Sequence, residues 1–379
     1  MAYIANWLSD RAQTKLVDTI VDSTHKDVTT EDPVLNEYFP IRMRNDFKYL
    51  GLILEKYNIL ASIIGVGGRS PVNKIGSWKE LNQDFIKVGL DFVFDENDQR
   101  RMEEVQRLAS LQGISVYTQY NPDGTPKVQG ENDTLASFIF GRAQDLVRSV
   151  NLLNDKLVYD VIQTGAISYT DTRTNIQVNL NFVDPSETFD SFPDALTGND
   201  RWDQLETAEP LTNLEEDCWA YEEVNGTQPK AILMSKVLYR SMWHCKSVID
   251  AASAFSTGVT AGKMTPAILT RILEERGLPP IILSDRRYDY VDGAGQRQKG
   301  RFLNTNRYVF LCEQMGERAI GPTIESKGGD INAKPKAGVY LNTKQDPYIA
   351  TNDIMECAAN ILPLVYNPRY LFSRQVTST

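Results

Sequence analysis

Residues 132–164, NDTLASFIFGRAQDLVRSVNLLNDKLVYDVIQT, decide the fold of this 379-residue chain. Apolar side chains recur there at spacings of three, four or seven residues: Leu135, Ile139, Leu146, Val150, Leu153, Leu157 and Val161. This spacing places them on one face of an α-helix. With Asp133 as its N-cap and Gly165 at its end, the helix would be about 45–50 Å long, against a mean of ~11–12 residues for globular helices. Gly141 and Asn151 are positions where it could bend.

Upstream of this helix, two apolar runs flank a polar loop. KYNILASIIG (56–65) is a continuous apolar run, and DFIKVGLDFVFD (84–95) alternates apolar with polar residues. The 18 residues between them, Gly65 to Asn82, are rich in Gly, Pro, Ser and Asn. We interpret the segment as a long β-hairpin. The loop that joins its two strands is longer than the ~12–15 residues of an ordinary loop, which indicates that the hairpin has a function of its own. Residues 1–46 are polar and predict an arm that lies on another surface.

Shorter elements fill the rest of the first 220 residues. Asp95 is expected to cap a helix that runs to about Leu111, and a Pro-Asp-Gly turn in YTQYNPDGTPKVQ predicts a hairpin. After the long helix, ISYTD and the strictly alternating NIQVNLNF predict a further hairpin.

From Gln228 the pattern becomes α/β. PKAILMS and LPPIILSD are expected to be buried strands, and RYVFLCE a further strand. Ser235 is predicted to cap a helix with Leu238, Met242, Cys245 and Ile249 on one face. TPAILTRILEERG has Thr265 as cap, Pro266 in the first turn and Gly277 at its end. A hairpin is expected around Asp292-Gly293. The C-terminal part predicts strands separated by Asp346-Pro347, Pro363 and Asn367-Pro368.

The charge is negative and unevenly distributed. Forty basic and fifty acidic residues give a net charge of -10, which argues against holding DNA by broad charge neutralisation. Asp184 to Glu223 contains thirteen acidic residues and one basic residue, Arg201, and so carries -12 of that charge, leaving about +2 for the rest. We expect this acidic segment to face, in part, basic residues of an adjacent copy, including Arg286 and Arg287.

Several protein classes are disfavoured by the composition. No stretch reaches the ~20 apolar residues of a membrane span. The N-terminal residues MAYIANWLSDRAQTK have no basic leader before an apolar core, so a signal peptide is not expected. Four widely spaced cysteines (Cys218, Cys245, Cys312 and Cys357) are expected to be reduced. Only two histidines, His25 and His244, are available for nucleophilic catalysis or a multi-histidine metal site.

Five motifs are candidate functional sites. Gly65, Gly67 and Gly68 lack the third glycine and following helix of a phosphate loop. His244 and Cys245 are helix neighbours that point about 100° apart, so they are not expected to form a dyad. His25 has no ligand-like neighbours. Glu215, Glu216 and Asp217 could bind a cation or serve as a carboxylate pair, but they fit a solvated acidic face better. The basic hairpin could bind nucleic acid, an acidic surface of another copy, or solvent alone; it contains Arg286, Arg287, Arg297, Lys299 and Arg301. We therefore predict no catalytic, cofactor-binding or metal-binding residue.

The order of these elements resembles a tailed-phage major capsid protein of the Hong Kong 97-type fold, and within that fold the lambda-type major capsid protein E family. The segments that carry the resemblance are GVGGRSP, LVRSVNLLNDKLVYDVIQTGAISYTD, PKAILMS, NTNRYVFLCEQMGERAIGPTIES and ILPLVYNPRYLFSRQV. They span most of the chain.

The resemblance implies an α+β fold in five parts. These are an N-terminal arm (1–46), an extended β-hairpin loop (47–98), a peripheral domain with a long spine helix (99–220), an α/β axial domain (221–338) and a C-terminal return strand of the peripheral domain (339–379). One branch of the fold cross-links subunits through Lys and Asn. Lys74 and Lys79 lie in the loop, but no partner Asn or catalytic Glu is assigned, so no cross-link is predicted.

The implied function is that of a structural protein of the virion, made in the host cytoplasm, that self-assembles into hexamers and pentamers of an icosahedral shell. The shell would enclose double-stranded DNA without sequence-specific binding and without a membrane. A portal protein and a scaffold would be partners, and a decoration protein is left open. An encapsulin-like nanocompartment shell is the alternative, followed by an α/β enzyme using the Gly65 loop.

Overall fold

The computed structural model describes residues 32–46, 48–54, 78–95, 97–98, 100, 131–171, 176–183, 191–255, 265–292, 294–327, 334–345 and 353–378. Most of the predicted arm, the predicted strand at 56–65, residues 65–77 of the Gly65 loop, most of the helix expected after Asp95 and the Pro-Asp-Gly hairpin lie outside these residues. At the start of that helix, the Asp95 carboxylate accepts a hydrogen bond from the backbone N of Asp98 (2.7 Å), as a cap does.

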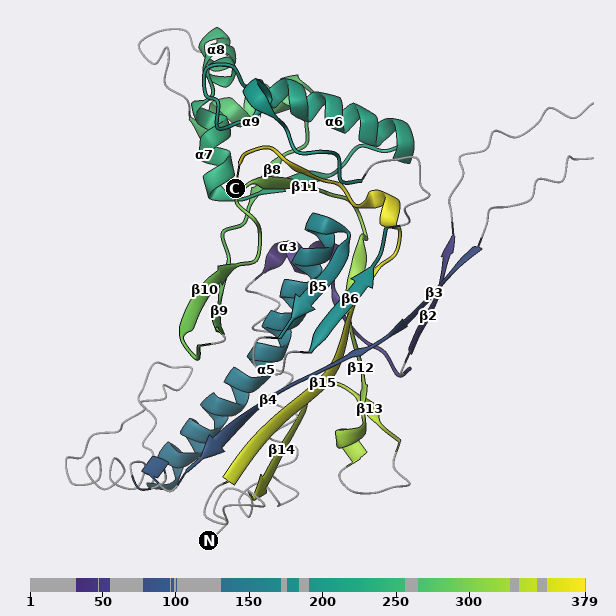
Figure 1. Ribbon diagram of the computed structural model, residues 1–379, viewed down its shortest axis with the longest axis vertical. Coiled ribbons are helices and arrows are strands. Elements are labelled where there is room, and N and C mark those ends of the chain that lie inside the picture. The colour runs from purple at the N-terminus through teal and green to yellow at the C-terminus, as the bar shows by residue number, and fades with distance from the viewer. Residues whose placement is uncertain are drawn as a thin grey trace, which may run out of the picture.

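The molecule consists of a lower part built on one long helix and an upper α/β part (Figure 1). The long helix, α5, spans Glu131–Thr164 and is confirmed at 34 residues. It begins before Asp133, which therefore lies in the first turn and is not the cap. It ends where predicted, at Gly165, whose φ is +70°. A Cβ there would lie 2.4 Å from Val183 Cγ2, so only glycine fits.

The lower sheet is built around β15, Asp353–Val365. β4 (Ile86–Phe94) pairs with it antiparallel on one edge, and β14 (Tyr340–Gln345) and β12 (Gly316–Thr323) follow each other along the other edge. β1 (Ile41–Met43) runs parallel to β12, and β13 (Lys336–Ala337) pairs with its end. Every residue of β12 is buried. Figure 1 shows α5 lying along β4 and β15.

Pro363 does not separate two strands, contrary to the prediction; it lies inside β15. The backbone N of its partner Arg318 donates to Pro40 O, away from β15, so the Arg318–Pro363 pair is not hydrogen-bonded. The nitrogen of Pro363 therefore faces the β4 edge. β4 ends its pairing at Ile361, two residues earlier, so no ladder bond is lost.

The extended hairpin pairs differently from the prediction. β2 (Lys48–Leu54) pairs antiparallel with β3 (Trp78–Asp84), most of which had been assigned to the polar loop. The alternating run 84–95 is β4 and belongs to the lower sheet. The loop prediction is wrong here because WKELNQD carries polar residues on both faces, and polar residues are more typical of loops than of strands. Figure 1 shows β2 and β3 as a ribbon that extends away from the body.

Two other predicted hairpins are confirmed. β5 (Ala166–Thr170) pairs with β6 (Gln177–Asn181), and β9 (Arg287–Val291) pairs with β10 (Arg297–Arg301). In the second turn, Asp292 Oδ1 accepts hydrogen bonds from the backbone N of Ala294 (3.0 Å) and of Gln296 (2.8 Å).

The upper part holds a four-stranded sheet in the order β16-β11-β7-β8. Its strands are β16 (Ser373–Gln375), β11 (Arg307–Leu311), β7 (Ala231–Met234) and β8 (Ile281–Leu283). Four helices accompany it: α6 (Pro210–Asn225), α7 (Lys236–His244), α8 (Lys246–Phe255) and α9 (Pro266–Glu275). The single-turn elements are η1 (Gly198–Asp200), η2 (Ile324–Lys327) and η3 (Pro368–Tyr370). β7 is fully buried as predicted, whereas β8 is an edge strand and only half buried.

Helix caps in the upper part follow the sequence closely. The Ser235 hydroxyl accepts from Leu238 N (3.1 Å) and the Thr265 hydroxyl from Ile268 N (3.3 Å). The helix that begins after Ser235 is shorter than predicted, because Cys245 adopts an extended conformation (φ -66°, ψ 135°) and separates α7 from α8.

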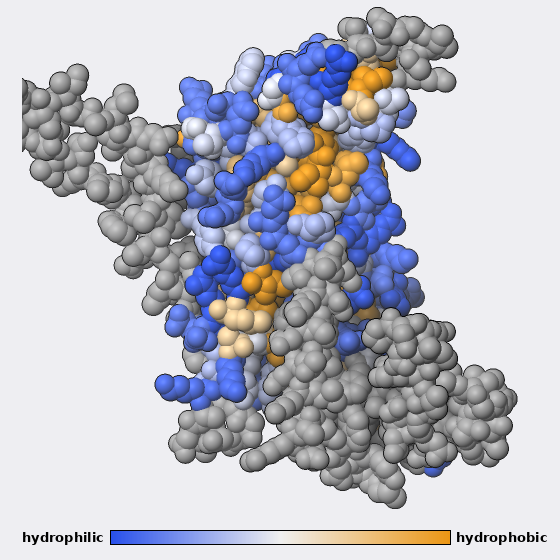
Figure 2. All heavy atoms as spheres, turned by 180° about the vertical axis from the view of Figure 1, so that it is seen from behind, coloured by the Kyte–Doolittle hydropathy of each residue, from blue (hydrophilic) through white to orange (hydrophobic). Residues whose placement is uncertain are grey.

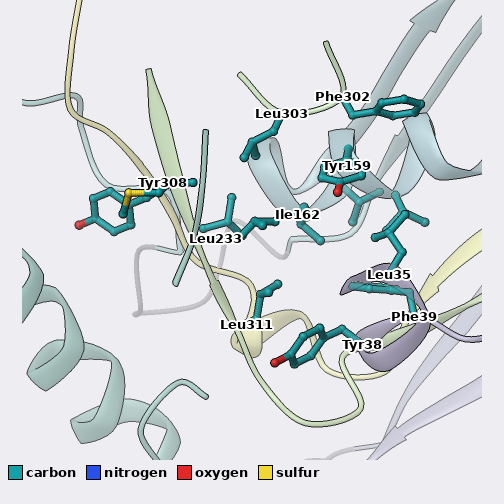
Figure 3. Close-up of a cluster of buried hydrophobic side chains, with 14 of the residues drawn as sticks. Leu35, Tyr38, Phe39, Tyr159, Ile162, Leu233, Phe302, Leu303, Tyr308 and Leu311 are labelled. Atoms are coloured by element: carbon teal, nitrogen blue, oxygen red, sulfur yellow. The ribbon is translucent and has the colours of Figure 1, made fainter. Parts of the chain in front are cut away.

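One buried apolar cluster runs through both parts of the molecule. It includes the short N-terminal helix α3, Pro33–Tyr38, which is inserted between α5 and the upper sheet. Figure 3 shows the cluster, with labelled side chains from α3 and the residue after it, from α5, and from β7 and β11: Leu35, Tyr38, Phe39, Tyr159, Ile162, Leu233, Tyr308 and Leu311. On the face seen in Figure 2, polar side chains cover most of the described surface and apolar residues gather in patches on both parts.

Candidate functional site

The most unusual buried chemistry surrounds Asp155, in the middle of the α5 buried face. Its side chain is 1% exposed. Asp155 Oδ1 accepts from Arg318 Nη1 at 2.5 Å, and Oδ2 accepts from Arg286 Nη1 at 2.9 Å. Arg318 comes from β12, and Arg286 precedes β9. One carboxylate therefore joins the long helix to the lower sheet and to the β9–β10 hairpin.

The N-terminal segment is bound to the same cluster. Asp32, the cap of α3, accepts from Leu35 N (3.0 Å), from the Tyr159 hydroxyl (3.0 Å) and from Arg286 Nη1 (2.8 Å). Arg318 donates to Phe39 O (2.8 Å) and to the side chain of Asn36. We call Asp32, Asp155, Arg286 and Arg318 the ionic junction. It connects four segments that are far apart in the sequence.

Burial and the opposite charges nearby together set the pKa values of the residues in the junction. Burial raises the pKa of Asp155, and the guanidiniums of Arg318 and Arg286 oppose that rise. Burial acts to lower the pKa of Arg286, but Asp155 and Asp32 hold it above its ordinary value. The pKa of Tyr159 is raised, first by burial and then by the Asp32 charge, so it remains a hydrogen-bond donor. A buried ion pair of this kind is weak evidence for net stability, but removing one partner strongly destabilises the fold because the other charge is left buried.

A second buried acid lies next to the junction in sequence and on the opposite face of β12. Glu317, whose side chain is fully buried, accepts from Arg44 Nε (2.6 Å) and Nη2 (2.7 Å) and from the Tyr366 hydroxyl (2.6 Å). Adjacent strand residues point to opposite faces, so both faces of β12 are tied by charge to the N-terminal segment.

A third buried acid, Asp217 of α6, organises the upper part. It accepts from the Tyr308 hydroxyl and from Arg374 Nη1 (2.7 Å). The Tyr308 ring stacks on Trp202, with centroids 5.5 Å apart. These contacts join α6 to β11 and β16. The three acids are thus paired within the protein, and what they do is hold distant segments in register.

The described residues contain no group of three or more His, Cys, Asp or Glu placed to hold a metal ion. In the same part of the chain, no helix is long and apolar enough to cross a membrane.

The residues considered as candidate site residues from the sequence do not come together in one site among the described residues. His25, Lys74 and the glycines at 65, 67 and 68 lie outside the described residues. His244 is exposed, whereas Cys245 is buried, and burial raises the pKa of its thiol to about 11. Cys218, Cys312 and Cys357 are also free thiols and buried. The Arg286 neighbours Arg287, Arg297 and Lys299 are exposed, and Arg301 pairs with Asp285.

Two charge predictions were wrong in part. Asp217 does not belong to a solvated acidic face, because it is bound by Tyr308 and Arg374. Arg286 does not face an adjacent copy, because its guanidinium binds Asp32 and Asp155 of its own chain. Glu215 also has a partner within the chain, Arg276, at 3.0 Å.

Sequence reasoning missed the junction and Glu317. One signal was present: Asp155 falls on the same helical face as Val158 and Ile162, where a charge requires a partner. A second signal was the charged pair Glu317-Arg318 inside the otherwise small and apolar stretch MGERAIGP.

No protein-family model and no curated protein matches the sequence. Among solved structures, the chain is similar to a prophage protein of E. coli CFT073 assigned as a capsid protein. The TM-score is 0.55 at 12% identity, over 90% of this chain and 92% of that chain.

Two further similarities are weaker. A phage-related protein from Bordetella bronchiseptica RB50 gives a TM-score of 0.48 at 11% identity, over 94% and 96% of the two chains. A capsid chain of Myoviridae phage XM1 gives 0.44 at 13% identity, over 91% of each. The similarity to the E. coli prophage protein shows the fold: the chain has the Hong Kong 97-type capsid fold, as expected from the sequence.

Proposed function

We propose that this chain, which folds as a Hong Kong 97-type subunit, is the major capsid protein of a tailed phage. It would assemble as hexamers and pentamers into the icosahedral shell around a double-stranded DNA genome. Its role is then structural rather than enzymatic. It would be made in the host cytoplasm and reside in the virion.

The β2–β3 ribbon carries this proposal. β2 pairs with β3 over seven residues, and among the described strands neither pairs with any other. An isolated two-stranded hairpin is at best marginally stable in water, and its open edges offer unpaired backbone groups. Figure 1 shows the ribbon extending away from the rest of the subunit. A neighbouring subunit that covers it would supply the missing contacts.

The ionic junction would keep the core of each subunit rigid. Asp155, Arg318 and Asp32 fix α5, β12 and the N-terminal segment relative to one another. A shell subunit needs this rigidity because each copy must hold its contacts at defined angles. The five divisions expected from the sequence, with boundaries at 46, 98, 220 and 338, become the arm, extended loop, peripheral domain, axial domain and return strand of this subunit.

The partners are part of the same proposal. Portal and scaffold proteins would act during assembly, and a decoration protein could add to the finished shell. The net charge of -10 suits a wall that encloses DNA without binding its sequence. The encapsulin-like shell has less support, because the similar structure with a TM-score of 0.55 is assigned as a prophage capsid protein. Nuclease-protected DNA in purified particles from infected cells would support the capsid; an enzyme cargo would support the encapsulin.

Removing the connection between β2 and β3 tests its role in assembly. Leu54 and Trp78 are paired across the two strands, so residues 55–77 can be replaced by Asn-Gly, which forms a tight hairpin turn. We expect the variant to keep its far-ultraviolet circular dichroism and to lose closed particles in electron micrographs. A matched control replaces only Gly293-Ala294 by Asn-Gly in the β9–β10 turn. Normal particles from the shortened variant would contradict a role in assembly for the connection between β2 and β3.

A further inference from the structure

Two helices of the upper part present opposite charges on their exposed faces. α6 contains acidic residues and no basic ones, and α7 contains basic residues and no acidic ones. The exposed side chains of α6 are Glu216, Trp219, Ala220, Glu223 and Val224. Those of α7 are Lys236, Val237, Arg240 and His244. In each set the spacings of one, three and four residues place the side chains on a single face of the helix.

These charges form no ion pair among the residues that the structure describes, although Glu216 contributes, after Asp217 and Tyr308, to the raised pKa of Arg374. In the described part of the chain, Glu216 and Glu223 of α6 form no ion pair, and neither do Lys236 and Arg240 of α7. The inward-facing acids of α6 do have partners: Glu215 binds Arg276 and Asp217 binds Arg374. The outward pairs therefore remain available to a molecule outside the subunit.

Each face also exposes an apolar side chain among its charges. Trp219 is 65% exposed on α6, with Val224 beside it at 44%, and Val237 is 45% exposed on α7. A large aromatic residue surrounded by charged residues is the usual composition of a binding surface, because the ring supplies burial and the rim supplies selectivity. Tryptophan is among the residues that most often dominate such surfaces.

The two faces lie at different ends of the upper part. Figure 1 shows α6 running to one end of it, while α7 lies at the other end below α8. One copy therefore cannot satisfy both faces by itself. A second copy, turned about an axis, would be able to present its α7 to the α6 of the first. Such a head-to-tail contact uses two different surfaces and closes into a ring when the rotation divides a full turn.

We propose that the acidic face of α6 in one copy binds the basic face of α7 in the next, and that this contact closes the ring of upper parts. The proposal rests on the proposed shell function and specifies one of its contacts. It replaces Arg286, which is used inside the subunit, by Lys236 and Arg240 as the basic partners of the acidic segment. Trp219 lies at the centre of the contact, where it meets the apolar Val237.

Charge reversal tests this pairing. One variant carries Glu216→Lys and Glu223→Lys, a second carries Lys236→Glu and Arg240→Glu, and a third carries all four changes. We expect each two-residue variant to raise the protein concentration needed for half-maximal assembly about tenfold or more, because like charges would then meet. The four-residue variant restores opposite charges and should assemble within about threefold of the unaltered chain.

The measurement is sedimentation velocity at low and high salt on the full-length chain. The defect should be smaller at 500 mM than at 50 mM NaCl, since salt shortens the Debye length. The matched control reverses two exposed acids elsewhere in the upper part, Asp250→Lys and Glu274→Lys, with the same change in net charge. This control should assemble normally.

The outcomes separate the two proposals. Normal assembly of both two-residue variants, or no restoration in the four-residue variant, would overturn the α6–α7 contact while leaving the shell function intact. Two-residue variants that keep their native circular dichroism should also co-assemble with each other when mixed, and failure to do so would overturn the contact. If a two-residue variant loses its native circular dichroism, the single changes Glu223→Lys and Arg240→Glu take its place, with the same expected results. Absence of assembly by the unaltered chain under all conditions would overturn both proposals.

Discussion

Replacing Asp155 by Asn should destabilise the subunit far more than any surface charge change. Asp155 is 1% exposed and accepts two charge-assisted hydrogen bonds, at 2.5 Å from Arg318 and at 2.9 Å from Arg286. Asparagine keeps the shape but removes the charge and turns one acceptor into a donor. Arg286 retains Asp32, whereas Arg318 keeps only the neutral acceptors Phe39 O and Asn36.

The expected change in the free energy of unfolding follows from the loss of the Asp155 charge. Breaking a buried ion pair by removing one partner costs about 3–5 kcal/mol, because the other charge is left buried. Burial already raises the pKa of Asp155, so part of the attraction is offset in the native protein, and we expect about 3 kcal/mol. Asp145→Asn is the matched control on the same helix. Asp145 is 57% exposed and pairs with Arg142 at 3.7 Å, so its loss should cost ~0.5 kcal/mol or less.

The assay is urea unfolding of the dissociated subunit, followed by tryptophan fluorescence. Buried Trp202 reports on the upper part, and circular dichroism reports on α5. A double-mutant cycle adds Arg318→Met and the combination of the two changes. The double variant should lose less than the sum of the single variants, since removing both charges leaves none of this pair unpaired. An Asp155→Asn effect below ~1 kcal/mol, or strict additivity, would refute the coupling assigned to this pair.

Three further predictions concern a helix end, a buried thiol and the exposed tryptophan. Gly165→Ala should lower the free energy of unfolding by at least ~1–2 kcal/mol in urea, since the φ of Gly165 is +70° and Val183 blocks a Cβ. Gly141→Ala, with open space around it, should instead raise the free energy of unfolding by ~0.5–1 kcal/mol. Equal effects of the two changes would contradict this account. Burial raises the pKa of Cys357 from 9.0 to about 12, so between these values the unfolded chain loses a proton that the folded chain keeps and stability falls as pH rises. Cys357→Ala should reduce that slope by about 1 kcal/mol per pH unit near pH 10–11, and an unchanged slope would exclude the thiol as its source. Trp219→Ser should leave subunit stability within ~0.5 kcal/mol but weaken assembly at least fivefold in light scattering, and undiminished assembly would remove Trp219 from the interface.

The elements predicted correctly from the sequence are those whose structure is decided by residues close by in the sequence. The apolar spacing from Leu135 to Val161 predicted α5, and Gly165 predicted its end, because helical periodicity and the positive φ of a helix terminus are local properties of the backbone. The caps at Ser235 and Thr265 were predictable for the same reason. Alternation also identified β4, although its partner strand was wrong.

The strand pairings and the buried ion pairs could not be predicted, because they depend on contacts between residues far apart in the sequence. Nothing near WKELNQD in the sequence indicates that it pairs with residues about thirty positions earlier, and its polar character favoured a loop. Pro363 is compatible with β15 only because β4 ends before reaching it. The partners of Asp155 are 131 and 163 residues away, so a buried charge could be suspected from the helical face but its partners could not be identified.

Electron microscopy of the purified full-length chain tests the central claim most directly. We predict closed particles built from rings of five and six copies, with the β2–β3 ribbon of each copy lying on a neighbour. A chain that remains monomeric at high concentration, with β2 and β3 paired and solvent-exposed, would contradict the proposal that this protein forms a shell.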